Sequence, residues 1–135
     1  MLPSRIVYAH CDVPCGIYDP KPAQIAAATV AKMVEKIQAL PTENLSVADR
    51  NSFVRMVLTK EEHAQKCKAE LLILWTDYFK PEHLAMFPNL HETFWKAAKL
   101  CSKNKQSVDT AASEELVKAV DEIAEMFQKS KQAAK

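Results

Sequence analysis

The sequence predicts an all-α protein, an antiparallel four-helix bundle that follows an irregular N-terminal hook. Four stretches carry apolar residues at steps of three and four, the repeat that gives a helix one buried face. Glycine occurs only once in the 135 residues, although a β-rich fold uses many glycines in its turns. The loops between the four stretches are short, and short loops make consecutive helices antiparallel.

The bulk composition narrows the class of protein. A chain of this length forms one domain with a core of its own. Its 48% hydrophobic and 26% charged residues are typical of a globular protein rather than a disordered one. A formal net charge of +1 gives no field that favours nucleic acid or an anionic membrane surface. No apolar run could span a bilayer, and residues 1–9 are too short for a secretory signal, so we expect a cytoplasmic protein.

The first helix is expected over residues 21–39. Asp19 and Pro20 suit its start, because aspartate caps free backbone N–H groups and proline fits the first helical turn. Pro41 ends it. Its apolar face is predicted to contain Ala26, Val30, Met33, Ile37 and Leu40.

The second helix is expected to begin near Ser46 and to end before Pro81. Ser46 and Asp49 resemble a capping box in which Asp replaces the usual Glu. If continuous, this helix spans about 50 Å. Its buried face skips one turn at Lys60 and is predicted to contain Phe53, Val57, Ala64, Cys67, Leu71, Leu74 and Tyr78.

The third and fourth helices complete the bundle. The third is expected to begin at Asn89 as a cap, with Glu92 three positions further on, and to bury Leu90, Phe94, Ala97 and Cys101. The fourth covers residues 110–131 and buries Leu116, Val120, Ile123 and Phe127. Cys67 and Cys101 therefore read as buried free thiols.

The chemically unusual segment precedes the helices. It contains His10, Cys11 and Cys15, and its proline and glycine at positions 14 and 16 make the backbone turn sharply at the second thiol. A tight turn can bring both sulfurs and the imidazole to one point. Such N and S donors suit Ni, Cu or Zn rather than Ca or Mg. The set is too small for a closed structural zinc site, and its spacing differs from Cys-x-x-Cys redox motifs.

The backbone is the nearest source of further donors. A chain cut before His10 would offer its α-amine, and the Cys11 amide, once deprotonated, would offer a second nitrogen. With two thiolates these atoms complete a square plane, and the His10 imidazole becomes an axial fifth ligand. Ni(II) and Cu(II) prefer this tetragonal geometry. On spacing alone, a Cys11–Cys15 disulfide or unrelated thiols remain alternatives to metal binding.

Two blocks of sequence resemble the nickel superoxide dismutase family. Residues 10–20, His-Cys-Asp-Val-Pro-Cys-Gly-Ile-Tyr-Asp-Pro, are similar to its nickel hook nearly position for position. Residues 74–81, Leu-Trp-Thr-Asp-Tyr-Phe-Lys-Pro, are similar to the end of its long second helix. The resemblance implies a four-helix bundle, a homohexamer, and Ni(II)/Ni(III) cycling that disproportionates superoxide to oxygen and hydrogen peroxide.

The resemblance also implies a maturation step and a ligand set. A leader peptidase would remove residues 1–9, ahead of the hook at 10–20 and the bundle at 21–135. One nickel ion per subunit would then bind the amine and imidazole of His10, the amide and thiolate of Cys11, and the thiolate of Cys15.

Three further residues, Tyr18, Tyr78 and Lys80, match positions that the family places around the metal. We expect Tyr18 to close the site against larger anions and to order water or substrate, and Lys80 to attract superoxide by its charge. Each has a structural alternative. Tyr18 could equally pack the hook against the bundle, Tyr78 lies on the buried face of the second helix, and Lys80 stands at a helix end, where lysines interact with the helix dipole.

Two positions depart from the family's pattern. Ala26 stands where the family often has a glutamate, and His63 where it has an arginine, and those two side chains usually support the axial histidine. His63 is the candidate for partly replacing the support that the arginine gives to the axial histidine. Two other functions also fit the residues: a non-enzymatic nickel carrier that needs no cleavage, and a helical interaction module with a Cys11–Cys15 disulfide.

Overall fold

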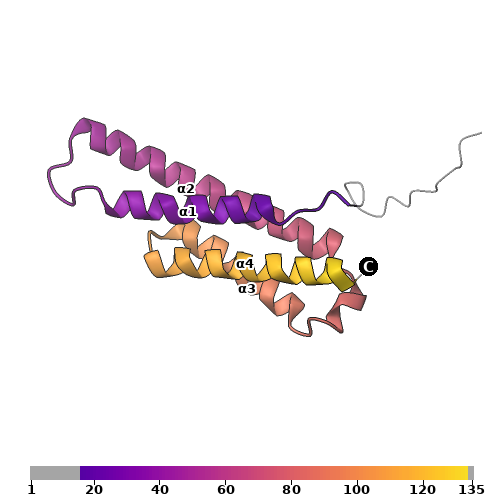
Figure 1. Ribbon diagram of the computed structural model, residues 1–135. Helices are drawn as coiled ribbons and strands as arrows, with labels where there is room; N and C mark the ends of the chain where they lie inside the picture. Colours follow the sequence, from indigo (N-terminus) through magenta and orange to yellow (C-terminus); the bar gives the residue numbers. More distant parts are fainter. Residues whose placement is uncertain (1–15, 134–135) are drawn as a thin grey trace, which may run out of the picture.

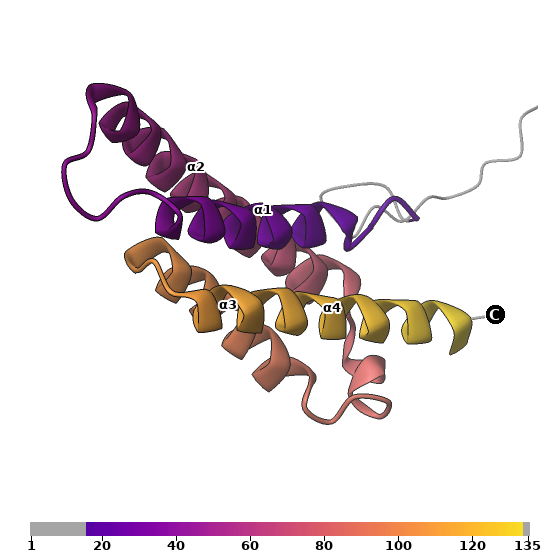
Figure 2. The same ribbon diagram turned by 60° about the vertical axis from the view of Figure 1, so that its left-hand side comes forward.

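The computed structural model describes residues 16–133, and the helices of that part of the chain form a four-helix bundle (Figure 1). The helices are α1 (Lys21–Gln38), α2 (Val47–Ile73), α3 (Leu90–Gln106) and α4 (Thr110–Ala133). Each helix packs against two others, in the pairs α1–α2, α2–α3, α3–α4 and α1–α4. Consecutive helices run in opposite directions (Figure 2), so the predicted antiparallel bundle is confirmed.

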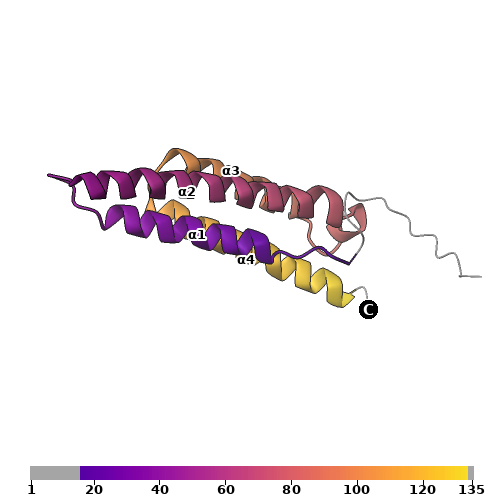
Figure 3. The ribbon, with the colours of Figure 1, turned by 90° about the horizontal axis from the view of Figure 1, so that it is seen from above.

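One end of the bundle collects three separate parts of the chain. The start of α1, the end of α2 and the end of α4 all lie there (Figure 3). The connection from α2 to α3 contains a π-helical turn, η1 (Leu74–Tyr78), and a short 3₁₀ turn, η2 (Pro81–Leu84). The segment that follows the hook and the second family-like block therefore meet at the same end. Between residues 16 and 133, no helix has the length and apolar character that a membrane span requires.

Local capping explains where two of the helices begin. Asp49 N–H donates to Ser46 Oγ at 3.0 Å and Ser46 N–H donates to Asp49 Oδ2 at 3.3 Å, so the predicted capping box is present at α2. Lys21 N–H donates to Asp19 Oδ1 at 2.9 Å at the start of α1. Asn89 precedes α3 as predicted, although its side chain makes no capping hydrogen bond.

The core confirms the predicted faces of α3 and α4, since every residue expected to be buried on them is buried. The face of α1 differs in part. Val34 is buried there, whereas Met33 is only half-buried. The reason is that α1 packs against both α2 and α4, so its buried face is wider than a single stripe. It consists of Ala23, Ala26, Ala27, Val30, Val34 and Ile37.

The first half of α2 was predicted wrongly as core. Phe53 is 43% exposed and Val57 is half-buried, and the buried positions of α2 begin only at Lys60. The apolar repeat identifies the face of a helix correctly, but it cannot show whether another helix covers that face.

Lys60, where the apolar face skips a turn, is itself buried and 1% exposed. Its amine donates to the backbone carbonyl of Asn104, and to that of Lys105 at 3.0 Å. These carbonyls belong to the last turn of α3, where helical carbonyls have no partner within the helix. Burial lowers the pKa of Lys60, and the neighbouring carboxylate of Glu61 opposes this shift.

Candidate functional site

The bundle end that follows the hook holds five ring side chains centred on Tyr78, called here the aromatic cluster. Tyr18 is 9% exposed, and its ring meets that of Tyr78 edge-on with centroids 5.7 Å apart. The ring centroid of Tyr78 also lies 5.0 Å from that of Phe79 and 4.5 Å from that of Phe127. The Tyr78 ring stacks on that of His83, with centroids 5.9 Å apart and an interplanar angle of 11°. Of these five residues, only the two tyrosines were predicted from the sequence to belong to the site.

The backbone before Tyr18 turns at Gly16, as predicted from its position next to the second thiol of the hook. Gly16 has φ +95°, in the left-handed region that side chains other than glycine rarely adopt. A Cβ added at Gly16 would meet no atom within 4 Å. The glycine is therefore required by the backbone conformation and not by lack of space.

The π turn η1 sets the orientation of Tyr78 and Phe79. Phe79 N–H donates to Leu74 O at 2.9 Å, which is the i→i+5 bond of a π turn. The sequence pattern predicted a regular helix through this segment, and that prediction is wrong at the π turn. Its extra residue rotates the chain relative to an α-helix, so Phe79 is buried and Tyr78, predicted to lie on the buried face, is only half-buried.

The hydroxyl of Tyr78 is engaged by α4. Tyr78 Oη lies 2.7 Å from Ser130 Oγ, and Ser130 Oγ donates its only proton to Phe127 O at 2.6 Å. Tyr78 must therefore be the donor to Ser130. This bond joins η1, which directly follows α2, to the end of α4 and holds the Tyr78 ring in place.

Lys80 and His83 are coupled through the backbone. The N–H of Lys80 donates to His83 Nδ1 at 2.9 Å, so neutral His83 carries its proton on Nε2. The residue Lys80 is exposed at the rim of this end. His83 was not predicted from the sequence as a member of the site. His83 follows Lys80 by three residues in a 3₁₀ turn, and residues i and i+3 of such a turn lie on the same side. This spacing could have indicated that Lys80 and His83 lie together.

The three predicted metal ligands, His10, Cys11 and Cys15, lie outside the described residues. Within residues 16–133, no group of three or more His, Cys, Asp or Glu side chains could hold a metal ion. Two thiols, an imidazole and backbone nitrogens form a soft donor set that fits nickel by its chemistry.

Two positions, Ala26 and His63, depart from the family pattern. Ala26 has no hydrogen-bonding side chain, and His63 lies away from the aromatic cluster. Ala26 is 1% exposed in the core. His63 Nδ1–H donates to Thr59 O at 2.9 Å within its own helix. It precedes Tyr78 by fifteen residues, which is roughly 22 Å along a helix. The structure therefore places His63 outside the cluster.

Comparison with known proteins gives consistent matches over nearly the whole chain. The family described as nickel-containing superoxide dismutase matches residues 5–131. The chain is 37% identical over 131 residues to the nickel superoxide dismutase of Streptomyces seoulensis and 34% identical over 131 residues to that of Streptomyces coelicolor. Each match covers 97% of this chain and 95% of the relative.

Solved structures agree with these sequence matches. A native nickel superoxide dismutase superposes with a TM-score of 0.79 at 33% identity. A nickel-containing superoxide dismutase with the nickel ligation of the oxidised state superposes with a TM-score of 0.78 at 36% identity. Both comparisons cover 91% of this chain and 99% of the solved chain.

Proposed function

Because this chain belongs to the nickel-containing superoxide dismutase family, we propose that its catalytic centre forms where the hook meets the aromatic cluster. The chain is an oxidoreductase that converts superoxide to oxygen and hydrogen peroxide with a nickel cofactor. One observation supports the location most directly. Tyr18, three residues after Cys15 in the sequence, packs on Tyr78 at 5.7 Å, so the chain that leaves the hook is anchored on the end of α2.

The residues of the hook would hold the metal. His10 would bind nickel through its amine and imidazole, Cys11 through its amide and thiolate, and Cys15 through its thiolate. Nickel bound in this way supplies the one-electron redox chemistry that both half-reactions of dismutation require. Tyr18, fixed edge-on against Tyr78, closes the approach to the hook and excludes anions larger than superoxide. Lys80, exposed at the same end, adds positive charge that attracts superoxide.

The mature enzyme begins at His10, after a peptidase removes residues 1–9. Three solved relatives carry named substitutions at a histidine in their first position, at an aspartate two positions later, and at a tyrosine eight positions later. His10, Asp12 and Tyr18 have the same residue types at the same spacing. This agreement supports a cut between Ala9 and His10, which frees the α-amine for the metal.

Three forms of the chain test the proposed ligand set. One begins at His10, the second begins at Ala9 as a matched control, and the third begins at Met1. Each is reduced and loaded with nickel, and nickel content, thiolate-to-nickel absorption and superoxide consumption are measured. We expect one nickel per chain and full activity only in the first form, because a single added residue turns the His10 amine into an amide.

Equal activity in the form that begins at Ala9 would contradict the role of the amine. A form beginning at His10 that holds nickel but consumes no superoxide would contradict the catalytic assignment. In the same assay, Cys11→Ser should lose both the absorption band and the activity, since one of the two thiolates is gone.

The enzyme is further proposed to assemble as a homohexamer. The half of α2 that the bundle leaves uncovered supports this assembly, because Val47, Phe53, Val54 and Leu58 are between 43% and 83% exposed. Phe53 and Val54 also line a hollow of about 650 Å³ together with Ile37, Leu40, Pro41 and Leu45. A continuous apolar surface of this kind is typical of contacts between subunits.

A further inference from the structure

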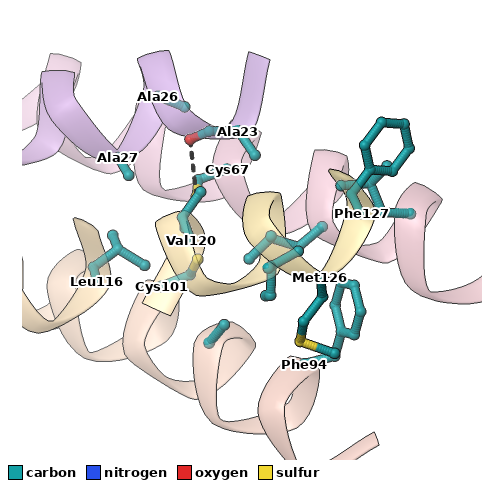
Figure 4. Close-up of a cluster of buried hydrophobic side chains, with 14 of the residues drawn as sticks. Ala23, Ala26, Ala27, Cys67, Phe94, Cys101, Leu116, Val120, Met126 and Phe127 are labelled. Carbon is teal, nitrogen blue, oxygen red and sulfur yellow. Dashed lines mark hydrogen bonds between the residues drawn. The ribbon is translucent and has the colours of Figure 1, made fainter. Parts of the chain in front are cut away.

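Two thiols in the bundle core take no part in the chemistry described above. Cys67 on α2 and Cys101 on α3 are both 0% exposed, and both lie in the same cluster of buried side chains (Figure 4). We propose that Cys67 and Cys101 form a dithiol that hydrogen peroxide oxidises to a disulfide joining α2 to α3. The proposal rests on the enzyme's activity only for the source of the peroxide.

A small side chain lies one turn before each thiol. Ala64 lies one turn before Cys67, Ala97 lies one turn before Cys101, and both alanines are 0% exposed. On the other side, Cys67 Sγ approaches Ala23 O of α1 at 3.5 Å (Figure 4). Small residues let packed helices approach closely, and a disulfide needs Cα atoms roughly 4.4–6.8 Å apart. α2 and α3 pack against each other, and the small residue one turn before each thiol allows the close approach that a disulfide between these helices needs.

The surroundings of the two thiols shift their pKa values in opposite directions. Hydrogen bonding between them raises the pKa of Cys67, and burial raises it further. The same hydrogen bond lowers the pKa of Cys101, with a contribution from the Lys68 ammonium, while burial opposes this shift. The thiolate is the form that attacks peroxide, so the lowered pKa favours Cys101 as the attacking residue and leaves Cys67 as the resolving one.

The reaction balances with peroxide alone as the oxidant. The Cys101 thiolate attacks one peroxide oxygen, the O–O bond breaks, and the hydroxide that leaves takes up the proton that Cys101 had lost, which leaves a sulfenic acid. Cys67 then attacks the Cys101 sulfur, the S–O bond breaks, and the oxygen departs as water with the proton of Cys67. Two thiols lose two electrons and two protons, and one peroxide becomes two waters.

The position of the pair relates it to the catalytic end. Cys67 precedes Tyr78 by eleven residues, which is roughly 16 Å along α2. Peroxide released near the aromatic cluster therefore forms close to the dithiol. Because both sulfurs are fully buried, peroxide reaches them only when the core opens locally, and we expect oxidation to be much slower than turnover.

Peptide mapping of the nickel-loaded enzyme tests the proposal. The enzyme is incubated with increasing hydrogen peroxide, quenched with catalase, unfolded in an alkylating reagent and digested after glutamate. We expect the peptide of residues 63–70 to be linked to that of residues 93–114, and a reductant to separate them. Recovery of both peptides fully alkylated, at doses that oxidise Cys11 and Cys15, would overturn the proposal. A link from either peptide to Cys11 or Cys15 would overturn it as well.

Two variants and a second oxidant source serve as controls. Cys67→Ala and Cys101→Ala fit a level of the core already built from alanines, and each should lose the linked peptide while superoxide consumption is unchanged. A superoxide generator replaces added peroxide in the second arm, with and without catalase. The link should form only without catalase. A link that forms with added peroxide but never during turnover would show that the enzyme's own product is not the oxidant. The experiment with added peroxide tests the disulfide itself even if the enzyme proves inactive.

Discussion

At the scale of single residues, Tyr78 is the side chain on which the proposed site depends most. Tyr18 meets its ring edge-on, His83 stacks on it, and Ser130 Oγ accepts a hydrogen bond from its hydroxyl. These three partners come from before α1, after η1 and near the end of α4. The position of the Tyr78 ring therefore depends on the correct packing of three parts of the chain that are distant in sequence.

Ser130→Ala should destabilise the protein by about 1 kcal/mol, because the half-buried Tyr78 hydroxyl loses its acceptor. The matched control is Ser113→Ala. Ser113 is also buried in α4 and makes the equivalent local bond, to Thr110 O at 2.8 Å, but it lies near the opposite end of that helix. The free energy of unfolding in urea measures both variants. Equal losses in the two would show that the bond to Tyr78 contributes nothing.

Tyr18→Phe should keep the nickel and the fold but lower superoxide turnover roughly 2–10-fold, the effect of one lost hydrogen bond near the reacting atoms. It should also increase inhibition by azide, an anion larger than superoxide, if the hydroxyl closes the site. Tyr78→Phe is the comparison, because it removes the bond to Ser130 and should lower stability more than turnover. Turnover and azide inhibition unchanged in Tyr18→Phe would leave this residue with a packing role only.

At the scale of helices, Lys60 connects the middle of α2 to the last turn of α3. Lys60→Met should lower the free energy of unfolding by about 2 kcal/mol, since the buried carbonyl of Asn104 and the part-buried carbonyl of Lys105 lose their donor. Lys66→Met is the matched control, because Lys66 is exposed on the same helix. Thermal and urea unfolding measure the difference, which should be close to zero for the control. Equal stability of the two variants would contradict the capping role.

The same lysine predicts a dependence of stability on pH. The pKa of Lys60 in the folded protein lies below its unfolded value of 10.5 because of burial. Between these two values the unfolded chain binds more protons, so the free energy of unfolding rises with pH across that window. The advantage of the wild type over Lys60→Met should therefore grow from neutral pH toward 10.5, as urea unfolding at several pH values would measure. A gap that narrows would contradict the shift.

How far the sequence predicts these elements depends on the range of the interactions. The start of α2 was predictable because Ser46 and Asp49 interact within one turn, and the faces of α3 and α4 follow from a local repeat. The π turn at Leu74–Tyr78 has no such local pattern, and the exposure of Phe53 depends on where other helices end. The two tyrosines of the cluster were found through the resemblance, whereas His83 and Ser130 reach it only through tertiary packing.

At the scale of the whole molecule, the uncovered half of α2 should decide the state of assembly. Phe53→Glu places a charge in the centre of the apolar surface, where burial against another subunit would be costly. We expect this variant to sediment as a smaller species than the wild type while its helical content by circular dichroism is unchanged. Val108→Glu, at an apolar residue of similar exposure between α3 and α4, should leave the assembly intact. Dissociation of both variants, or of neither, would count against this surface.

Ala23 is fully buried and its carbonyl lies 3.5 Å from Cys67 Sγ, so α1 packs tightly on α2 at this point. Ala23 is also only five residues from Tyr18. A bulkier side chain there would push α1 outward and carry the tyrosine off its partner ring. Substitutions that touch neither the metal ligands nor the substrate could thus alter turnover, so the volume of the core at Ala23 is a control on catalysis.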